Sequence, residues 1–138
     1  MKTQDINRRN FIHTGLLAAT GLAAARALQA EEPRVKLVKD KFVHSVYFWL
    51  KPGLAGAEVE KFKKGLNSLT TIESVDHAFI GTPAATDRPI IDHSYSYALV
   101  LVFKDKKAHD EYQVDPVHDA FRKYSTDLCA KVLIYDAV

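Results

Sequence analysis

The chain has 138 residues, one cysteine, and 19 basic against 17 acidic residues. The first 30 residues hold four of the basic and one of the acidic residues, which leaves 15 and 16 in the remaining part of the chain. This remainder carries no charge excess of the kind that a nucleic-acid or anionic-membrane partner requires. It is long enough for one small domain, and a single cysteine excludes an internal disulfide, so the fold must depend on packing.

The N-terminal segment has the features of an export signal. Arg8 and Arg9 precede the apolar Phe11, and an uncharged run rich in Ala and Gly follows over residues 14–25. This order is typical of a twin-arginine signal, and the run is too short to span a bilayer. We expect cleavage after Ala30 and export to the periplasm or the extracellular space, with no membrane span left after cleavage. The predicted segments are a signal peptide over 1–30, a flexible linker over 31–40 and one domain over 41–138.

The domain is predicted to begin with a strand and a helix. Residues 42–50 are mostly β-branched or aromatic, which favours a strand. Over residues 58–71, apolar side chains recur at steps of three and four, which predicts an amphipathic helix. Gly65 lies inside this helix and costs about 1 kcal/mol relative to alanine. We therefore expect it to permit a close approach of the helix to a sheet.

Two further strands are predicted at 74–80 and 94–103, separated by a loop rich in turn residues. The second of these has mostly apolar side chains on both faces, which predicts a central strand. Two helix starts follow, because Asp105 can cap one helix and Asp115 with Pro116 can begin another. A last strand is predicted over residues 130–136.

These elements follow the order β-α-β-β-α-β, which is the ferredoxin-like arrangement of the α+β class. It places helices on one face of a four-stranded antiparallel sheet. The other face would carry Val43, Ser45, Tyr47 and Trp49 of the first strand, and this set is too apolar for water. We therefore predict a homodimer in which a second copy covers this face.

Several segments carry a family resemblance. The first strand contains an early histidine, His44, and residues 95–105 and 132–136 match a middle and a closing strand. The most specific segment runs from Tyr112 to Phe121 and follows the pattern Tyr-x-x-His-Pro-x-His-x-x-Phe, with Asp115 in place of the first histidine. The domain thus resembles the stress-responsive α/β-barrel (Dabb) family, which belongs to the dimeric α/β-barrel superfamily.

The resemblance implies a function and a site. The family includes cofactor-independent cyclases of the olivetolic acid cyclase type, which use a tyrosine and a histidine that correspond to Tyr112 and His118. A further histidine of those cyclases is replaced here by Tyr97. The expected activity is therefore binding of a small hydrophobic carbonyl or phenolic compound, with acid–base chemistry as one outcome. The expected catalytic residues are His118 and Tyr112, and the expected substrate-binding residues are His44, Tyr97, Phe48, Leu101 and Phe121.

A structural role for the same residues remains open. His118 could bond to the backbone near Pro116, and Tyr112 could pack as a core ring. In that case the protein would be a non-catalytic stress-response or interaction protein acting as a homodimer. His109 is expected on a charged helix face and His93 in a loop. No histidine spacing is typical of a metal site, and no motif indicates a cofactor, so we expect neither.

Overall fold

The computed structural model describes residue 35 and residues 38–138, and the latter form one compact unit. The signal peptide predicted over residues 1–30, and most of the linker predicted over 31–40, lie outside this part of the chain. Within it, no helix combines the length and the apolar character needed to cross a membrane. The elements follow in the order β1 (Phe42–Leu50), α2 (Gly56–Leu69), β2 (Val75–Gly81), β3 (Tyr97–Phe103), α3 (Lys106–Gln113), α4 (Pro116–Leu128) and β4 (Cys129–Ala137).

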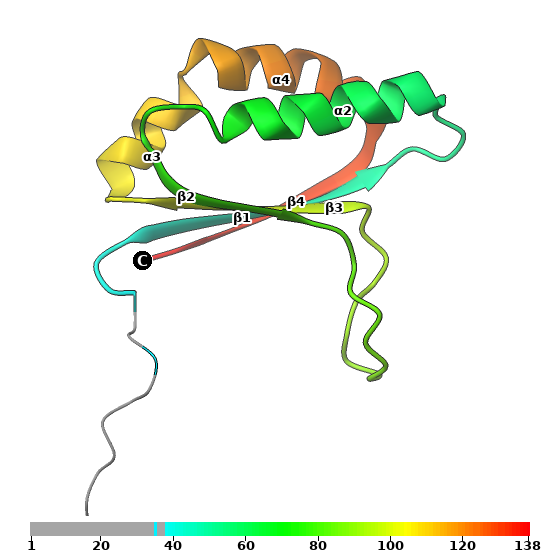
Figure 1. Cartoon of the computed structure of the whole chain (residues 1–138), viewed down its shortest axis with the longest axis horizontal. Helices are drawn as coiled ribbons and strands as arrows, with labels where there is room; N and C mark the ends of the chain where they lie inside the picture. Colours follow the sequence, from blue (N-terminus) through cyan, green and yellow to red (C-terminus); the bar gives the residue numbers. More distant parts are fainter. Residues whose placement is uncertain (1–34, 36–37) are drawn as a thin grey trace, which may run out of the picture. The chain divides into compact units, whose positions relative to one another are not determined.

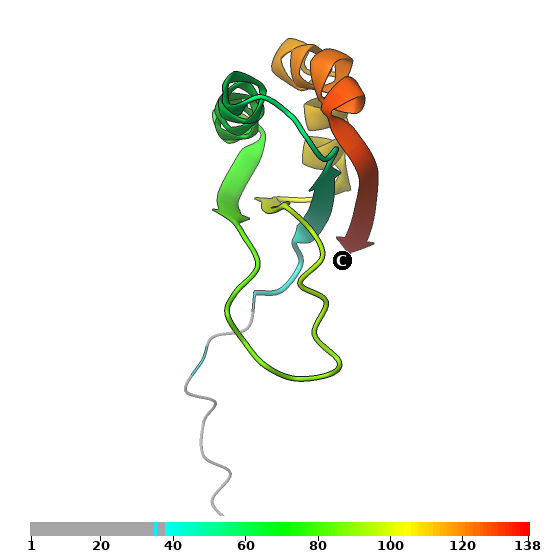
Figure 2. The same cartoon turned by 90° about the vertical axis from the view of Figure 1, so that its right-hand side faces the viewer.

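The strands form one antiparallel sheet in the order β2-β3-β1-β4, and the helices all cover the same face of it (Figure 1). This is the ferredoxin-like fold that the sequence predicts. β1 lies between β3 and β4, and its side chains alternate between a buried and a partly exposed face. The long segment between β2 and β3 extends from the sheet away from the helices (Figure 2).

The two helices between β3 and β4 begin where their capping residues predict. The side chain of Asp105 accepts a hydrogen bond of 2.9 Å from the backbone N–H of Ala108 at the start of α3. The side chain of Asp115 accepts one of 2.7 Å from Val117, and Pro116 is the first residue of α4. Proline is tolerated there because the first N–H groups of a helix have no partner within it. This pair of caps fixes the sharp break between α3 and α4.

The core fills the space between the helices and the sheet. Apolar side chains that are almost fully buried come from α2, β3 and α3 and include Phe62, Leu66, Leu99, Phe103 and Tyr112. Aromatic rings meet edge-on within it, as Phe48 and Phe62 do with centroids 5.3 Å apart.

Gly65 permits a close approach, but to a helix rather than to the sheet. A β-carbon at this position would lie 2.7 Å from Cδ2 of Phe121 and would also collide with the Tyr124 hydroxyl, both on α4. The prediction that Gly65 permits a close approach to the sheet was therefore wrong. The periodicity of α2 identifies its buried face, but it does not show that α4 packs beside it on the same layer.

The third strand is shorter than predicted, because it begins at Tyr97 rather than at residue 94. The carboxylate of Asp92 accepts a hydrogen bond of 2.7 Å from the Ser94 N–H, which makes a turn there. The Ser96 hydroxyl accepts one of 3.0 Å from the Leu50 N–H, so a side chain replaces a ladder bond at the strand entrance.

The sheet face opposite the helices has no cover within the described residues. We call it the open sheet face, and its apolar members are Val43, Tyr47, Trp49, Phe79, Val100, Val102, Leu133 and Tyr135. Phe79 is 62% exposed and Tyr135 is 59% exposed. These side chains share one face of adjacent strands, so they form one apolar surface rather than scattered single residues.

Candidate functional site

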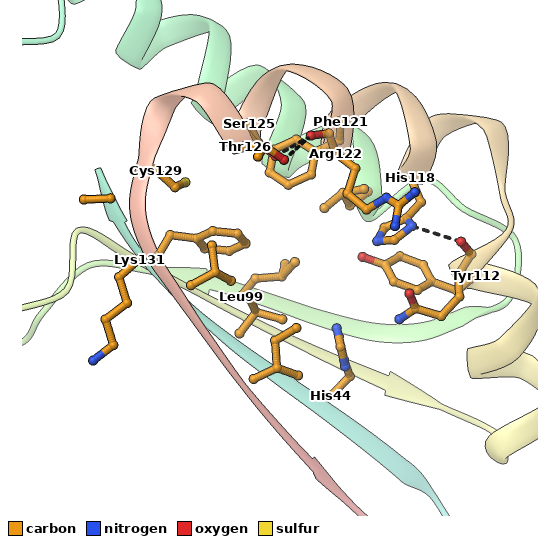
Figure 3. A pocket seen from close by; sticks show the side chains of 17 residues that line it. His44, Leu99, Tyr112, His118, Phe121, Arg122, Ser125, Thr126, Cys129 and Lys131 are labelled. Carbon is orange, nitrogen blue, oxygen red and sulfur yellow. Dashed lines mark hydrogen bonds between the residues drawn. The ribbon is translucent and has the colours of Figure 1, made fainter. Parts of the chain in front are cut away.

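A cavity of about 420 Å³ lies between α4 and the part of the sheet formed by β1 and β4 (Figure 3). This volume is in the range of sites for small organic ligands. The walls are mostly apolar. His44, Tyr112 and His118 gather at the end formed by α3, α4 and the start of β1, and Ser125, Thr126 and Lys131 lie toward the other end (Figure 3). The lining residues are His44, Val46, Phe48, Leu69, Leu99, Tyr112, Gln113, His118, Phe121, Arg122, Ser125, Thr126, Cys129, Ala130, Lys131, Val132 and Ile134.

Tyr112 and His118 meet at this end of the cavity. Tyr112 lies in the last turn of α3 and His118 in the first turn of α4, and the break at Pro116 brings their ring centroids to 4.6 Å. Figure 3 shows the tyrosine ring beneath the imidazole with its hydroxyl directed into the cavity. Burial raises the pKa of Tyr112 far above its usual value of 10.0, because ionisation would place a charge in an apolar environment. The hydroxyl therefore remains a proton donor at any physiological pH.

His118 is held as a neutral imidazole. It is 8% exposed, and burial lowers its pKa below 6.5, although a hydrogen bond to the backbone opposes this shift. That bond joins Nδ1 to the Gln113 carbonyl oxygen at 3.2 Å, and because a carbonyl only accepts, Nδ1 carries the proton. In this tautomer Nε2 is unprotonated and free to accept a proton.

His44 stands on β1 opposite Asp136 of β4. The strand register pairs the two residues directly, and His44 Nδ1–H donates a hydrogen bond of 2.6 Å to a carboxylate oxygen of Asp136. The short distance would also suit an ion pair. However, burial lowers the pKa of His44 by more than the bond to Asp136 raises it, since the ring is only 4% exposed. His44 is therefore neutral near pH 7, with Asp136 fixing its tautomer.

His109 is buried, so its prediction on an exposed, charged helix face was wrong. It is 9% exposed, and its ring stacks on Phe42 at 4.3 Å and lies 5.0 Å from the His44 ring. The Gln113 side-chain amide donates a hydrogen bond of 3.0 Å to its Nε2. Its Nδ1 is buried without a hydrogen-bond partner among the described residues. The charged neighbours in sequence form ion pairs with one another, Lys106 with Asp110 and Lys107 with Glu111, and Asp110 also lies 3.6 Å from His109 Nδ1.

The other expected site residues divide into two groups. Phe48 and Phe121 line the cavity, with ring centroids 6.0 Å apart. Tyr97 and Leu101 lie on the same sheet face but outside the lining, because α2 covers β3: Tyr97 packs against Phe62 at 5.7 Å, and Leu101 is wholly buried. In their place β4 contributes walls at Val132 and Ile134.

Comparison with known proteins gives one family. The sequence model of the Stress responsive A/B Barrel Domain matches residues 42–138. No curated protein sequence matches the chain.

Solved structures give the same fold. A Dabb family protein with a ferredoxin-like fold from Mesorhizobium loti is 28% identical, with a TM-score of 0.58, and the match covers 71% of this chain and 95% of that one. A dimeric ferredoxin-like protein of unknown function from Thermobifida fusca is 16% identical, with a TM-score of 0.59 and coverage of 78% and 99%. Hydroxynitrile lyase from Passiflora edulis is 19% identical, with a TM-score of 0.60 and coverage of 71% and 92%. Among these proteins of the same fold, the one from Thermobifida fusca is dimeric and the one from Passiflora edulis is an enzyme.

Proposed function

The chain belongs to the stress responsive A/B barrel domain family, and from that premise we propose that its cavity binds a small hydrophobic carbonyl or phenolic compound and performs cofactor-free acid–base chemistry on it. One observation carries this proposal. A neutral imidazole with a free Nε2 and a buried tyrosine hydroxyl that stays protonated meet at one end of a largely apolar cavity.

The two side chains supply complementary roles. His118 Nε2 takes a proton from the carbon next to the substrate carbonyl, and the electron pair of that C–H bond moves toward the carbonyl oxygen. The Tyr112 hydroxyl donates a hydrogen bond to the oxygen as its negative charge grows. The carbanion equivalent then closes onto a second carbonyl or expels a leaving group, and His118 returns the proton.

His44 is a second polar group on the opposite wall, and Asp136 holds its ring in place. Its Nε2 is also unprotonated in this tautomer, so it can accept a hydrogen bond from a substrate hydroxyl. The apolar rings of Phe48 and Phe121 would then contact the body of the substrate. A compound with an apolar body and a carbonyl or hydroxyl group at the end near Tyr112 and His118 fits this distribution.

The lyase from Passiflora edulis supports the proposal at the level of the fold alone. At 19% identity it indicates that this architecture can house a catalytic site, and its substrate does not transfer to this chain.

The proposal is tested with His118→Ala and Tyr112→Phe against a panel of hydrophobic phenols and polyketide-like carbonyl compounds. Calorimetric binding and turnover are measured for each compound, together with thermal stability. Tyr112→Phe keeps the ring and removes only the hydroxyl. Tyr124→Phe is the matched control, because Tyr124 lies on α4 outside the cavity lining.

We expect both site variants to lose binding or turnover of at least one compound while the control retains it. If the parent binds no compound, and both site variants melt early, the two residues are structural. The protein would then be a non-catalytic stress-response or interaction protein, which is the alternative that the sequence leaves open.

We also propose that the chain forms a homodimer through the open sheet face. The face gathers apolar and aromatic side chains from all strands, including Tyr47 and Tyr135, whose ring centroids are 6.4 Å apart. Removal of apolar surface from water is the main favourable contribution to the association of two protein surfaces. The protein of the same fold from Thermobifida fusca is dimeric, which supports a dimer without identifying the face that forms it.

Export by the twin-arginine route, with a mature domain in the periplasm or the extracellular space, is likewise our proposal. It rests on Arg8, Arg9 and the apolar run after them. This route carries folded proteins, which suits a domain that has no disulfide to form outside the cell.

A further inference from the structure

Three side chains with metal-binding atoms converge around His44, which also lines the cavity. His44, His109 and Asp136 each offer one ligand atom, and these atoms all lie within 4.8 Å of one another. They come from β1, α3 and β4. We propose that they form a binding site for a divalent transition metal of the zinc class.

No spacing along the sequence predicts this set, because its members are far apart in the chain. The strand register places Asp136 opposite His44, and the packing of α3 places His109 over His44. His109 lies one helical turn before Tyr112, so both project from the same side of α3 toward the sheet.

The ligand types select the metal. Two imidazoles and one carboxylate are a ligand set of zinc sites that leave a coordination position open, and imidazole binds Zn²⁺ and its neighbours well. Mg²⁺ and Ca²⁺ prefer oxygen ligands and retain water, so they should bind poorly here. The ligating nitrogen of a histidine must carry no proton, so binding through Nδ1, which lies 2.6 Å from Asp136, would place the proton of His44 on Nε2.

The geometry requires small movements only. Zinc ligands lie about 2.0–2.2 Å from the metal, so tetrahedral donors are roughly 3.3 Å apart. The contact of 2.6 Å between His44 and Asp136 would have to widen, and the 4.8 Å span of the set would have to contract. The Asp136 side chain is 44% exposed, so it can move and it gives a metal ion access from solvent.

His109 gives independent support. Its Nδ1 is buried and makes no hydrogen bond among the described residues, although the Asp110 carboxylate lies 3.6 Å away, and a buried nitrogen without a hydrogen bond is costly. Ligation through Nδ1 would place the proton of His109 on Nε2, and the Gln113 side chain, 3.0 Å away, would accept it through its oxygen after its amide rotates by half a turn. The site uses His44 in common with the proposed acid–base chemistry but needs neither Tyr112 nor His118, so either proposal can fail alone.

The experiment is calorimetric titration of the untagged full chain with Zn²⁺ at neutral pH, repeated with Mg²⁺, and visible absorption after Co²⁺ is added. The variants are His109→Phe, which keeps a flat ring against Phe42, and Asp136→Asn. His93→Phe is the matched control, since His93 is exposed in the β2–β3 segment. Melting curves establish that each variant is folded.

We expect one Zn²⁺ per chain and a Co²⁺ absorption band in the parent and in His93→Phe. Loss of an outer partner of a metal ligand typically weakens metal binding by roughly 10–100-fold. Loss of a ligand itself should weaken it more, so His109→Phe and Asp136→Asn should each reduce the affinity for Zn²⁺ at least about 100-fold. Mg²⁺ should show no saturable binding. Stoichiometric binding that survives either site variant, or a parent that binds no Zn²⁺, would overturn the proposal.

Discussion

Acidification should destabilise the folded domain through the two buried histidines of the cavity. Burial lowers the pKa of both His44 and His118 below 6.5 in the folded protein. In the unfolded chain both return to the ordinary value. Between the two values the unfolded chain binds more protons, so the free energy of unfolding falls as the pH falls through this interval. The contribution of these two histidines to the free energy of unfolding is complete above about pH 6.5 and is lost as the pH falls below it.

The size of the effect follows from proton counting. One proton bound on unfolding gives a slope of about 1.4 kcal/mol per pH unit, so two histidines give at most about 2.7 kcal/mol per pH unit at the steepest point. A change of this size over one pH unit is a large fraction of the free energy of unfolding of a typical domain, which is roughly 5–15 kcal/mol. The surface carboxylates with lowered pKa values, such as Asp76 and Asp92, lose their contribution only at lower pH, since their usual value is 3.8.

Urea denaturation from about pH 7.5 to about pH 5.5, at one ionic strength and one protein concentration and with a chelator present, measures the slope. His44→Gln and His118→Gln should each flatten it, and the double variant should remove most of it. His93→Gln is the control, because His93 is exposed in the segment between β2 and β3, and it should leave the slope unchanged. A parent whose stability is constant or rises on acidification would refute the assignment of neutral, buried imidazoles.

Three further predictions concern assembly, packing and export. Tyr135→Asp should convert the dimer to a folded monomer, because it places a charge in the open sheet face; analytical ultracentrifugation that still finds a tight dimer would locate the interface elsewhere. Gly65→Val should overpack α2 against α4 and lower the free energy of unfolding, measured by urea denaturation, by about 1–3 kcal/mol. Gly56→Val should lower it less, because a side chain at this position meets open space. Replacement of Arg8 and Arg9 by lysine should leave the precursor in the cytoplasm, as cell fractionation would show, and normal processing would exclude the twin-arginine route.

The fold was predictable because each element carries its own local signal. Alternation identifies the buried face of β1, and the aspartates at 105 and 115 with Pro116 locate both helix starts. The meeting of Tyr112 and His118 follows from the same break. Such signals are short-range, so a single sequence is sufficient to read them.

The rest of the site depends on long-range packing. Asp136 is an ordinary acidic residue near the end of a strand until the register between β1 and β4 places it opposite His44. His109 is surrounded in sequence by lysines and acids that pair on the outside of α3. Its spacing of three residues from Tyr112 was the available signal for the buried side. Tyr97 and Leu101 were misplaced because the sequence does not show which strand α2 covers.

The position of Asp136 affects how the protein should be handled. Val138 follows it by two residues, and β4 is an outer strand of the sheet. An affinity tag fused after Val138 would therefore place foreign residues, and with a polyhistidine tag competing imidazoles, within a few residues of the carboxylate that orients His44. A tag near residue 38 would not avoid this interference, because Val38 and Val138 line the same surface hollow, so any tag should be removed before binding is measured.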